Sequence, residues 1–135
     1  MDARASILVV DDEETVRSSY ARILDEMDCD AQAAVDGVQA LRAMERRPFD
    51  VVLLDLRMPG AHGLEVLKAI KGRWPASEVV VITGYPTLES AREALRLGAC
   101  DYLAKPADPD DVIGAARAAM RRKKWALRAE DAPVH

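Results

Sequence analysis

The sequence lacks several features that would place it outside the ordinary globular proteins. No apolar run approaches the roughly 20 residues that cross a membrane, and the Asp2-Ala3-Arg4 start lacks the apolar segment of a signal peptide. The formal net charge of −4 gives no electrostatic reason to expect nucleic-acid binding. We therefore expect a cytoplasmic protein that binds neither membranes nor nucleic acids directly.

Cysteine is also scarce. Cys29 and Cys100 have neither the close spacing nor the neighbouring histidines of a metal site, so both are interpreted as reduced, structural thiols. Aromatic residues make up only 4% of the chain, yet half of its residues are hydrophobic and 31% are charged. With 135 residues, the chain is long enough for one globular domain with its own core.

Short β-branched runs alternate along the chain with longer segments of helical period, which is typical of βα units around a parallel sheet. Strands are expected at residues 7–10, 30–35, 51–54, 79–82 and 102–104, and helices at about 16–27, 37–47, 63–73, 86–97 and from 109 onward. The helix positions expected to face the sheet are Val16, Tyr20, Ile23, Leu24 and Met27, then Val38, Leu41 and Met44, then Leu64, Leu67 and Ile70, then Leu88, Ala91 and Leu95, and last Val112, Ile113, Ala116 and Met120.

Polar side chains stand at the ends of four of these strands. They are Asp11 and Asp12 after the first strand, Asp55 after the third, Thr83 after the fourth and Lys105 after the fifth. Because the carboxyl ends of parallel strands line the crevice where ligands bind, these side chains should lie together. Three carboxylates, a hydroxyl and an ammonium suit a divalent cation held beside a phosphoryl group.

Each of these residues also has an ordinary interpretation. The acidic run from Asp11 to Glu14 would favour the positive end of the first helix, Thr83 is suited to a turn, and most lysines are simply solvated. Against this, two ionised carboxylates about 4 Å apart cost about 4 kcal/mol at an effective dielectric near 20. The cluster should therefore hold protons or recruit a cation, and a partial set of hard oxygen ligands suits Mg²⁺.

Taken together with Met58-Pro59-Gly60, Gly63, Gly84 and Tyr102, these strand-end residues make the chain resemble the receiver domain of bacterial two-component response regulators. The resemblance implies an α/β, flavodoxin-like (βα)5 fold, with a five-stranded parallel sheet of order 2-1-3-4-5 flanked by five helices. It assigns residues 1–125 to the receiver domain and residues 126–135 to a C-terminal tail or the start of a linker. Residues 56–60 are expected to form a loop.

The resemblance also implies a metal-dependent phosphoacceptor. Asp55 would accept a phosphoryl group from a sensor histidine kinase or a phosphotransfer protein. Asp12 and Asp55 would bind Mg²⁺ directly, Asp11 would help through water, and the backbone carbonyl of Arg57 would be a further ligand. The protein would then be no enzyme in the usual sense, since it would catalyse only its own phosphorylation and dephosphorylation.

A further group of residues would hold and read the phosphoryl group. Thr83 and Lys105 would bind its oxygens, and Thr83 with Tyr102 would switch the surface of the fourth helix, fifth strand and fifth helix. That surface would signal to a downstream protein or to an output domain missing from this chain. A phosphorylation-dependent homodimer stays open, with contributions expected from Arg92, Arg96, Arg117 and Arg121.

Two side chains are expected to set the lifetime of the phosphoaspartate. Arg57 and Tyr85 each lie two residues past a site residue, where family members tune how fast the phosphoryl group is lost to water. Their bulk predicts a long-lived product. His62 and the basic run Arg121–Lys124 are both interpreted as solvated, the latter with a favourable helix-dipole interaction.

Three other functions remain open from the residues. Haloacid-dehalogenase-type phosphatases use an aspartate after the first strand, which would make Asp11 the nucleophile, but nothing in that pattern explains Asp55. A flavodoxin-type binding module would need a glycine- and hydroxyl-rich loop after the first strand. The same fold could also serve as an unphosphorylated scaffold, an alternative that the complete set of strand-end residues argues against.

Overall fold

The computed structural model describes residues 4–58 and 61–131, in which strands and helices alternate as predicted. The strands are β1 (Ser6–Val10), β2 (Asp30–Ala34), β3 (Val51–Leu54), β4 (Arg57–Met58), β5 (Ala61–His62), β6 (Glu78–Thr83) and β7 (Asp101–Ala104). The helices are α1 (Glu14–Glu26), α2 (Gly37–Arg46), α3 (Gly63–Arg73), α4 (Leu88–Arg96) and α5 (Pro109–Asp131). None of these helices is long and apolar enough to span a bilayer.

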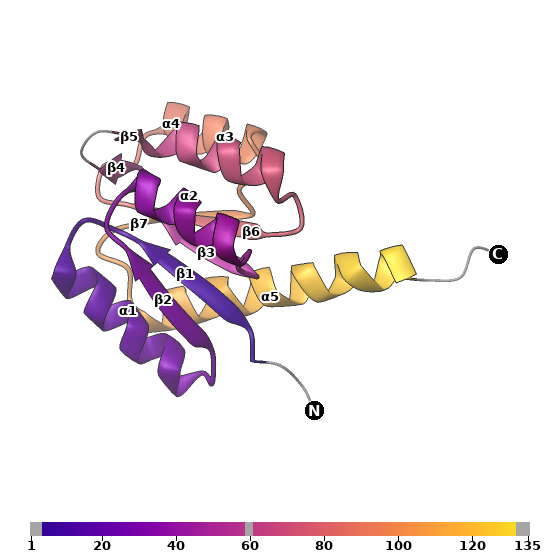
Figure 1. The fold of residues 1–135 in the computed structure, drawn as a ribbon. Helices are drawn as coiled ribbons and strands as arrows, with labels where there is room; N and C mark the ends of the chain where they lie inside the picture. The colour runs from indigo at the N-terminus through magenta and orange to yellow at the C-terminus, as the bar shows by residue number, and fades with distance from the viewer. Residues whose placement is uncertain (1–3, 59–60, 132–135) are drawn as a thin grey trace.

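Five of the strands form one sheet in the order β2-β1-β3-β6-β7, and all neighbours in it are parallel. The predicted order 2-1-3-4-5 is therefore confirmed. Helices α1 and α5 cover one face of the sheet, while α2, α3 and α4 cover the other (Figure 1). Because both faces are covered, the central strands are continuous hydrophobic runs rather than alternating ones.

Alternate strand residues enter two separate hydrophobic cores. Leu8, Val52 and Val81 belong to the core under α2, α3 and α4, whereas Val9, Leu53 and Ile82 belong to the core under α1 and α5. This alternation fixes which way each strand-end side chain points, because a shift of one residue would turn the whole strand over.

The segment expected as a plain loop contains a small antiparallel pair, in which β4 pairs with β5. The prediction was wrong for Arg57 and Met58, because a ladder of two residues leaves no hydrophobic pattern in the sequence. The third helix begins at Gly63 as predicted. A Cβ added there would lie 2.4 Å from the Cα of Leu56, so only glycine allows this approach to the end of β3.

The predicted inner face of the fourth helix was wrong. Helix α4 begins at Leu88 rather than near Pro86, and Leu88 and Leu95 are 68% and 53% exposed. The buried position is Ala94, because α4 lies against the short edge strand β7 and only a small side chain faces the core there. Val38 in α2 was also predicted to face the sheet and is exposed instead.

Helix α5 runs through the boundary expected at residue 125 and extends beyond the sheet (Figure 1). The basic run was predicted to be solvated, which holds for Arg122, whose side chain is 67% exposed, but not for Lys123, whose side chain is 17% exposed. Arg122 pairs with Glu78 at 3.3 Å, and Lys123 pairs with Asp50 at 2.9 Å. The division between a receiver domain and a tail at residue 125 stays a prediction.

Candidate functional site

The strand-end residues meet at the carboxyl edge of the sheet. Asp11, Asp12 and Asp55 each place a carboxylate oxygen within 4.8 Å of the others. Asp11 and Asp55 are 2% and 5% exposed, whereas Asp12 is open to solvent. The arrangement is thus a pair of buried carboxylates with a third, accessible one at their rim.

Lys105 joins the two buried carboxylates. Its Nζ lies 2.6 Å from Asp11 Oδ2 and 3.2 Å from Asp55 Oδ2. The lysine reaches this position because β7 pairs with β6, and its own backbone amide donates to the Thr83 carbonyl at 2.7 Å. One ammonium thus sits between two carboxylates that would otherwise repel each other.

The other oxygen of each buried carboxylate is held by a backbone amide two residues further along. The amide of Glu13 donates to Asp11 Oδ1 at 2.9 Å, and that of Arg57 donates to Asp55 Oδ1 at 3.1 Å. Arg17 also donates to the backbone carbonyl of Asp11 at 2.9 Å. Both carboxylates are therefore fixed in orientation before any ligand arrives.

The protonation equilibria of the site follow from burial and from these contacts. Burial raises the pKa of Asp55 above its ordinary value, and the Arg57 amide and the Lys105 charge offset only part of that rise. Burial alone would lower the pKa of Lys105, but the hydrogen bond to Asp11 and the two nearby carboxylates move it upward. Burial is the largest cause, so the Asp55 pKa stays raised although the Lys105 ammonium lies 3.2 Å away, and the nearby Asp11 charge adds to the rise. The site thus carries excess negative character.

Thr83 is the last residue of β6 and is 1% exposed. Its Oγ1 accepts a hydrogen bond from the Tyr85 amide at 3.2 Å, so the hydroxyl already organises the loop that leads to α4. The structure places Thr83 beside Lys105, as the sequence predicted, since the two are joined through the backbone.

Tyr102 lies apart from the carboxylates. It pairs in register with Val81, and its ring packs against the core under α2, α3 and α4. Its hydroxyl lies 2.5 Å from Ser90 Oγ and accepts from the Thr87 amide at 3.3 Å. The sequence did not indicate either partner, because neither residue belongs to a recognisable motif.

Arg57 and Tyr85 make a contact that their spacing alone could not establish. The Arg57 guanidinium lies over the Tyr85 ring, 3.8 Å from its centroid. Both side chains are exposed. His62, which precedes α3, is exposed as expected. That the Arg57 carbonyl is a metal ligand stays a prediction.

Two hollows help to locate the site. One of about 520 Å³ lies between the start of α1 and the residues that follow β7, and its lining includes Glu13, Tyr20, Gly84 and Lys105. It borders Lys105, whose ammonium contacts Asp11 and Asp55, although neither of these carboxylates lines it.

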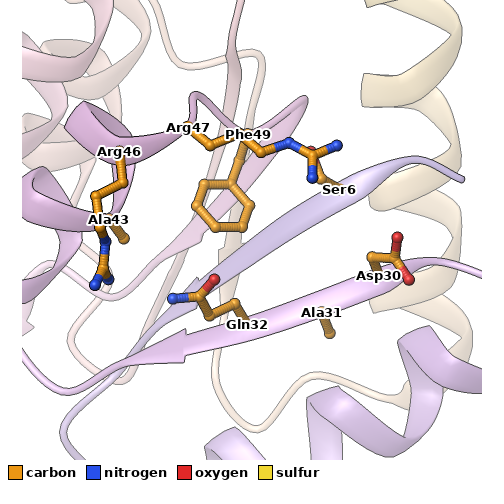
Figure 2. Close-up of a pocket in the computed structure, with 8 residues that line it drawn as sticks. All are labelled: Ser6, Asp30, Ala31, Gln32, Ala43, Arg46, Arg47 and Phe49. Carbon is orange, nitrogen blue, oxygen red and sulfur yellow. The ribbon is translucent and has the colours of Figure 1, made fainter. Parts of the chain in front are cut away.

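The other hollow, of about 350 Å³, lies where β1 and β2 begin, at Ser6 and Asp30. Figure 2 shows the Phe49 ring within it, with Arg46 and Arg47 on either side. Since parallel sheets bind ligands at the carboxyl ends of their strands, the hollow beside Lys105 is the relevant one.

Comparisons with known proteins agree with this geometry. A family model described as the response regulator receiver domain matches residues 7–117. The response regulator PilR of Pseudomonas aeruginosa is 36% identical over 132 residues, which are 98% of this chain and 29% of PilR. A crystal structure of NtrX from Brucella abortus superposes with a TM-score of 0.89 at 36% identity, covering 96% of this chain and 29% of that one.

A smaller structure matches over its whole length. A CheY-like receiver domain protein from Methanospirillum hungatei has a TM-score of 0.89 at 26% identity, covering 92% of this chain and 99% of that one. By contrast, the chain spans less than a third of the length of PilR and of several curated NtrX-like relatives. The similarity is therefore to one part of those longer proteins.

Proposed function

The chain belongs to the response regulator receiver domain family, and from that premise we propose that Asp55 accepts a phosphoryl group from a sensor histidine kinase or phosphotransfer protein in a Mg²⁺-dependent reaction. The observation that carries the proposal is the position of Lys105 between Asp11 and Asp55, with Asp12 at the rim. The protein is a signalling phosphoacceptor that catalyses only its own phosphorylation and dephosphorylation.

The donor set suits Mg²⁺. Three carboxylates within 4.8 Å supply hard oxygen ligands, and the exposure of Asp12 leaves room for water and a phosphoryl oxygen. Asp12, Asp55 and the Arg57 carbonyl would hold the ion directly, with Asp11 acting through water. When bound, the ion neutralises the charge on the phosphoryl oxygens.

The chain's own residues perform the remaining work. Asp55 attacks the phosphorus of the donor phosphohistidine, so that a P–O bond forms as the P–N bond breaks and its electron pair returns to the imidazole. The Arg57 amide orients the nucleophile, because it holds the opposite carboxylate oxygen. Lys105 turns its ammonium from Asp55 to a phosphoryl oxygen, and the Thr83 hydroxyl donates to another.

The new charge drives the signal. A phosphorylated side chain carries about −1.5 to −2 charges at neutral pH, which draws Thr83 toward the phosphate and lets Tyr102 move inward. To shift a population from 1:99 to 99:1, phosphorylation must favour the active state by about 5.5 kcal/mol. The surface of α4, β7 and α5 then signals to a downstream protein, to an output domain, or to a second copy in which Arg92 and Arg117 take part.

Intact mass and peptide mapping after incubation with acetyl phosphate test the phosphoacceptor role. The wild type should form a Mg²⁺-dependent adduct that maps to Asp55 and is absent from Asp55→Asn. An adduct on Asp11, or steady release of phosphate, would instead support the phosphatase alternative. No adduct under any condition would leave the fold as a scaffold.

A further inference from the structure

The hydroxyl of Tyr102 is part of the structure that caps α4. It lies 2.5 Å from Ser90 Oγ, a short distance for an O–H···O hydrogen bond, and it accepts from the Thr87 amide at 3.3 Å. Thr87 is the N-cap residue of α4, and Ser90 lies in its first turn. A side chain of the edge strand thus takes part in starting the neighbouring helix.

Thr87 and Ser90 already satisfy each other. Thr87 Oγ1 accepts from the Ser90 amide at 3.0 Å, while the Thr87 amide donates to Ser90 Oγ at 3.3 Å, which completes a capping box. Tyr102 therefore shares both the amide of Thr87 and the hydroxyl of Ser90 with this box. Without the Tyr102 hydroxyl, the capping box would stay intact but would lose its hydrogen bonds to β7.

Helix α4 has few other attachments. It is nine residues long, and Ala94 is its one buried residue. A helix this short is marginal in isolation, so its position depends on tertiary contacts and caps. With so little apolar surface buried, the position of α4 on the sheet depends in part on the hydrogen bond between Tyr102 and Ser90.

The loop before α4 is held at both ends by hydroxyl groups. At its start, Thr83 Oγ1 accepts from the Tyr85 amide at 3.2 Å; at its end, Tyr102 accepts from the Thr87 amide. Thr83 and Tyr102 also emerge on the same face of the sheet, because Tyr102 pairs with Val81 and Thr83 lies two residues beyond Val81. Thr83 and Tyr102 therefore hold the two ends of this loop from the same face of the sheet.

We propose that Ser90 is the latch of the switch: its hydroxyl holds Tyr102 against the first turn of α4, in the position that the unphosphorylated protein favours, and so ties the state of Asp55 to that turn. The inference rests on the proposed phosphoacceptor function and adds the residue that sets the equilibrium between the inactive and active states. Movement of Tyr102 away from α4 on phosphorylation must break the bond to Ser90, so the strength of that bond biases the unphosphorylated protein toward the inactive state. The first turn of α4 is released in the same step.

Beryllofluoride titration measures this bias directly. A mimic that binds only the active state has an apparent Kd equal to its intrinsic Kd divided by the fraction of molecules already in that state. The binding is followed by NMR of backbone amides in the presence of Mg²⁺, with Asp55→Asn as the negative control. Ser90→Ala should tighten the apparent affinity by about fivefold, the effect of one net hydrogen bond of about 1 kcal/mol. The Thr87 amide resonance should shift toward its beryllofluoride-bound position before any ligand is added.

Three variants separate the latch from a general effect on α4. Tyr102→Phe removes the same bond from the other side and should tighten binding to a similar extent. The double variant should bind no tighter than either single one, since both remove one interaction. Ser90→Thr keeps the hydroxyl and should bind as the wild type does.

The outcomes are distinct. If the wild type binds beryllofluoride and Ser90→Ala binds it with the same affinity, the latch proposal is wrong and the phosphoacceptor role stands. Additive effects in the double variant would lead to the same conclusion. Absence of Asp55-dependent binding in the wild type overturns the phosphoacceptor role, and the latch with it. Thermal unfolding of each variant shows whether α4 has stayed folded. This distinguishes a loss of structure from a shift in the equilibrium between the inactive and active states.

Discussion

The Arg57 guanidinium stacks on the Tyr85 ring, with its carbon 3.8 Å from the ring centroid. The amide of Arg57 donates to Asp55, and the amide of Tyr85 donates to Thr83, so the stacked pair joins the two loops that flank the proposed phosphorylation site. A cation–π contact at an exposed position is worth about 0.5–1 kcal/mol. We expect this contact to keep two large side chains over the approach of water to Asp55, and so to favour a long-lived phosphoaspartate.

Removing the ring should shorten that lifetime. We expect Tyr85→Ala to lose its phosphoryl group about two- to fivefold faster than the wild type, which corresponds to the loss of one exposed cation–π contact. The decay of the phosphorylated species by intact mass, after removal of the phosphodonor, measures this rate. Leu88→Ala is a matched control, because Leu88 is equally exposed and lies just beyond the same loop. A wild-type half-life of seconds at neutral pH would contradict the screening argument.

Lys105 should contribute strongly to the reaction. Lys105→Met keeps most of the aliphatic stem but removes the ammonium that lies between Asp11 and Asp55. We expect the initial rate of adduct formation with acetyl phosphate to fall by about 100-fold, as when one preorganised donor is lost from an anion site. Lys105→Arg should not restore the rate, since its planar guanidinium cannot replace a compact charge between two carboxylates. Wild-type rates in both variants would remove Lys105 from the mechanism.

The sequence predicted the sheet and the carboxylate cluster because both depend on local patterns. Each central strand is an uninterrupted apolar run, and the polar residue that ends it must lie at the carboxyl edge of a parallel sheet. The sequence therefore predicted that Asp11, Asp55 and Lys105 lie close together. Gly98, which follows the helix expected at about 86–97, has a positive φ of 107°, the conformation that favours glycine just after a helix.

Contacts between elements that carry no motif could not be predicted. Leu88 and Leu95 form an apolar stripe that looks like an inner face, but β7 offers α4 too little surface to cover them. Nothing in the spacing of Ser90 and Tyr102 indicates that they meet, because that depends on how α4 lies against β7. The same holds for Lys123, whose partner Asp50 lies 73 residues earlier, at the far end of the sheet from the proposed site.

Gly63 should tolerate no side chain. A Cβ there would lie 2.4 Å from Leu56 Cα and 2.8 Å from its carbonyl oxygen, and backbone atoms cannot turn aside as a flexible side chain can. We expect Gly63→Ala to lower the free energy of unfolding by about 1–3 kcal/mol. Gly72→Ala in the same helix is the control, because a Cβ there would meet nothing within 4 Å. That variant should gain about 0.5–1 kcal/mol. Urea unfolding of both measures the contrast, and equal effects would show that the loop yields at Gly63.

The anchor of α5 on the sheet should depend on pH. Lys123 donates to Asp50 at 2.9 Å, and the Asp50 carboxylate also accepts from the Ser6 amide at 2.9 Å. Burial would raise the pKa of Asp50, but the hydrogen bonds from Ser6 and Lys123 outweigh it and lower the pKa below its ordinary value. A lowered pKa in the folded state means that ionised Asp50 stabilises the fold above the unfolded-state value of about 4. This stabilisation is lost as the pH falls through the folded-state pKa.

Lys123→Met keeps the stem of the lysine and removes its charge, so it isolates the ion pair. We expect a loss of about 0.5–1 kcal/mol in the free energy of unfolding at pH 7, the upper range for a partly exposed pair. The loss should shrink as the pH falls below about 4, because Asp50 is then protonated in both variants. Urea unfolding at several pH values measures it, with Arg117→Met on the exposed side of α5 as a control that should stay within about 0.5 kcal/mol of the wild type throughout. A loss that is equal at all pH values would mean that Lys123 stabilises α5 through the packing of its aliphatic stem. The Asp50 carboxylate would then stabilise the fold only through its hydrogen bonds with Ser6.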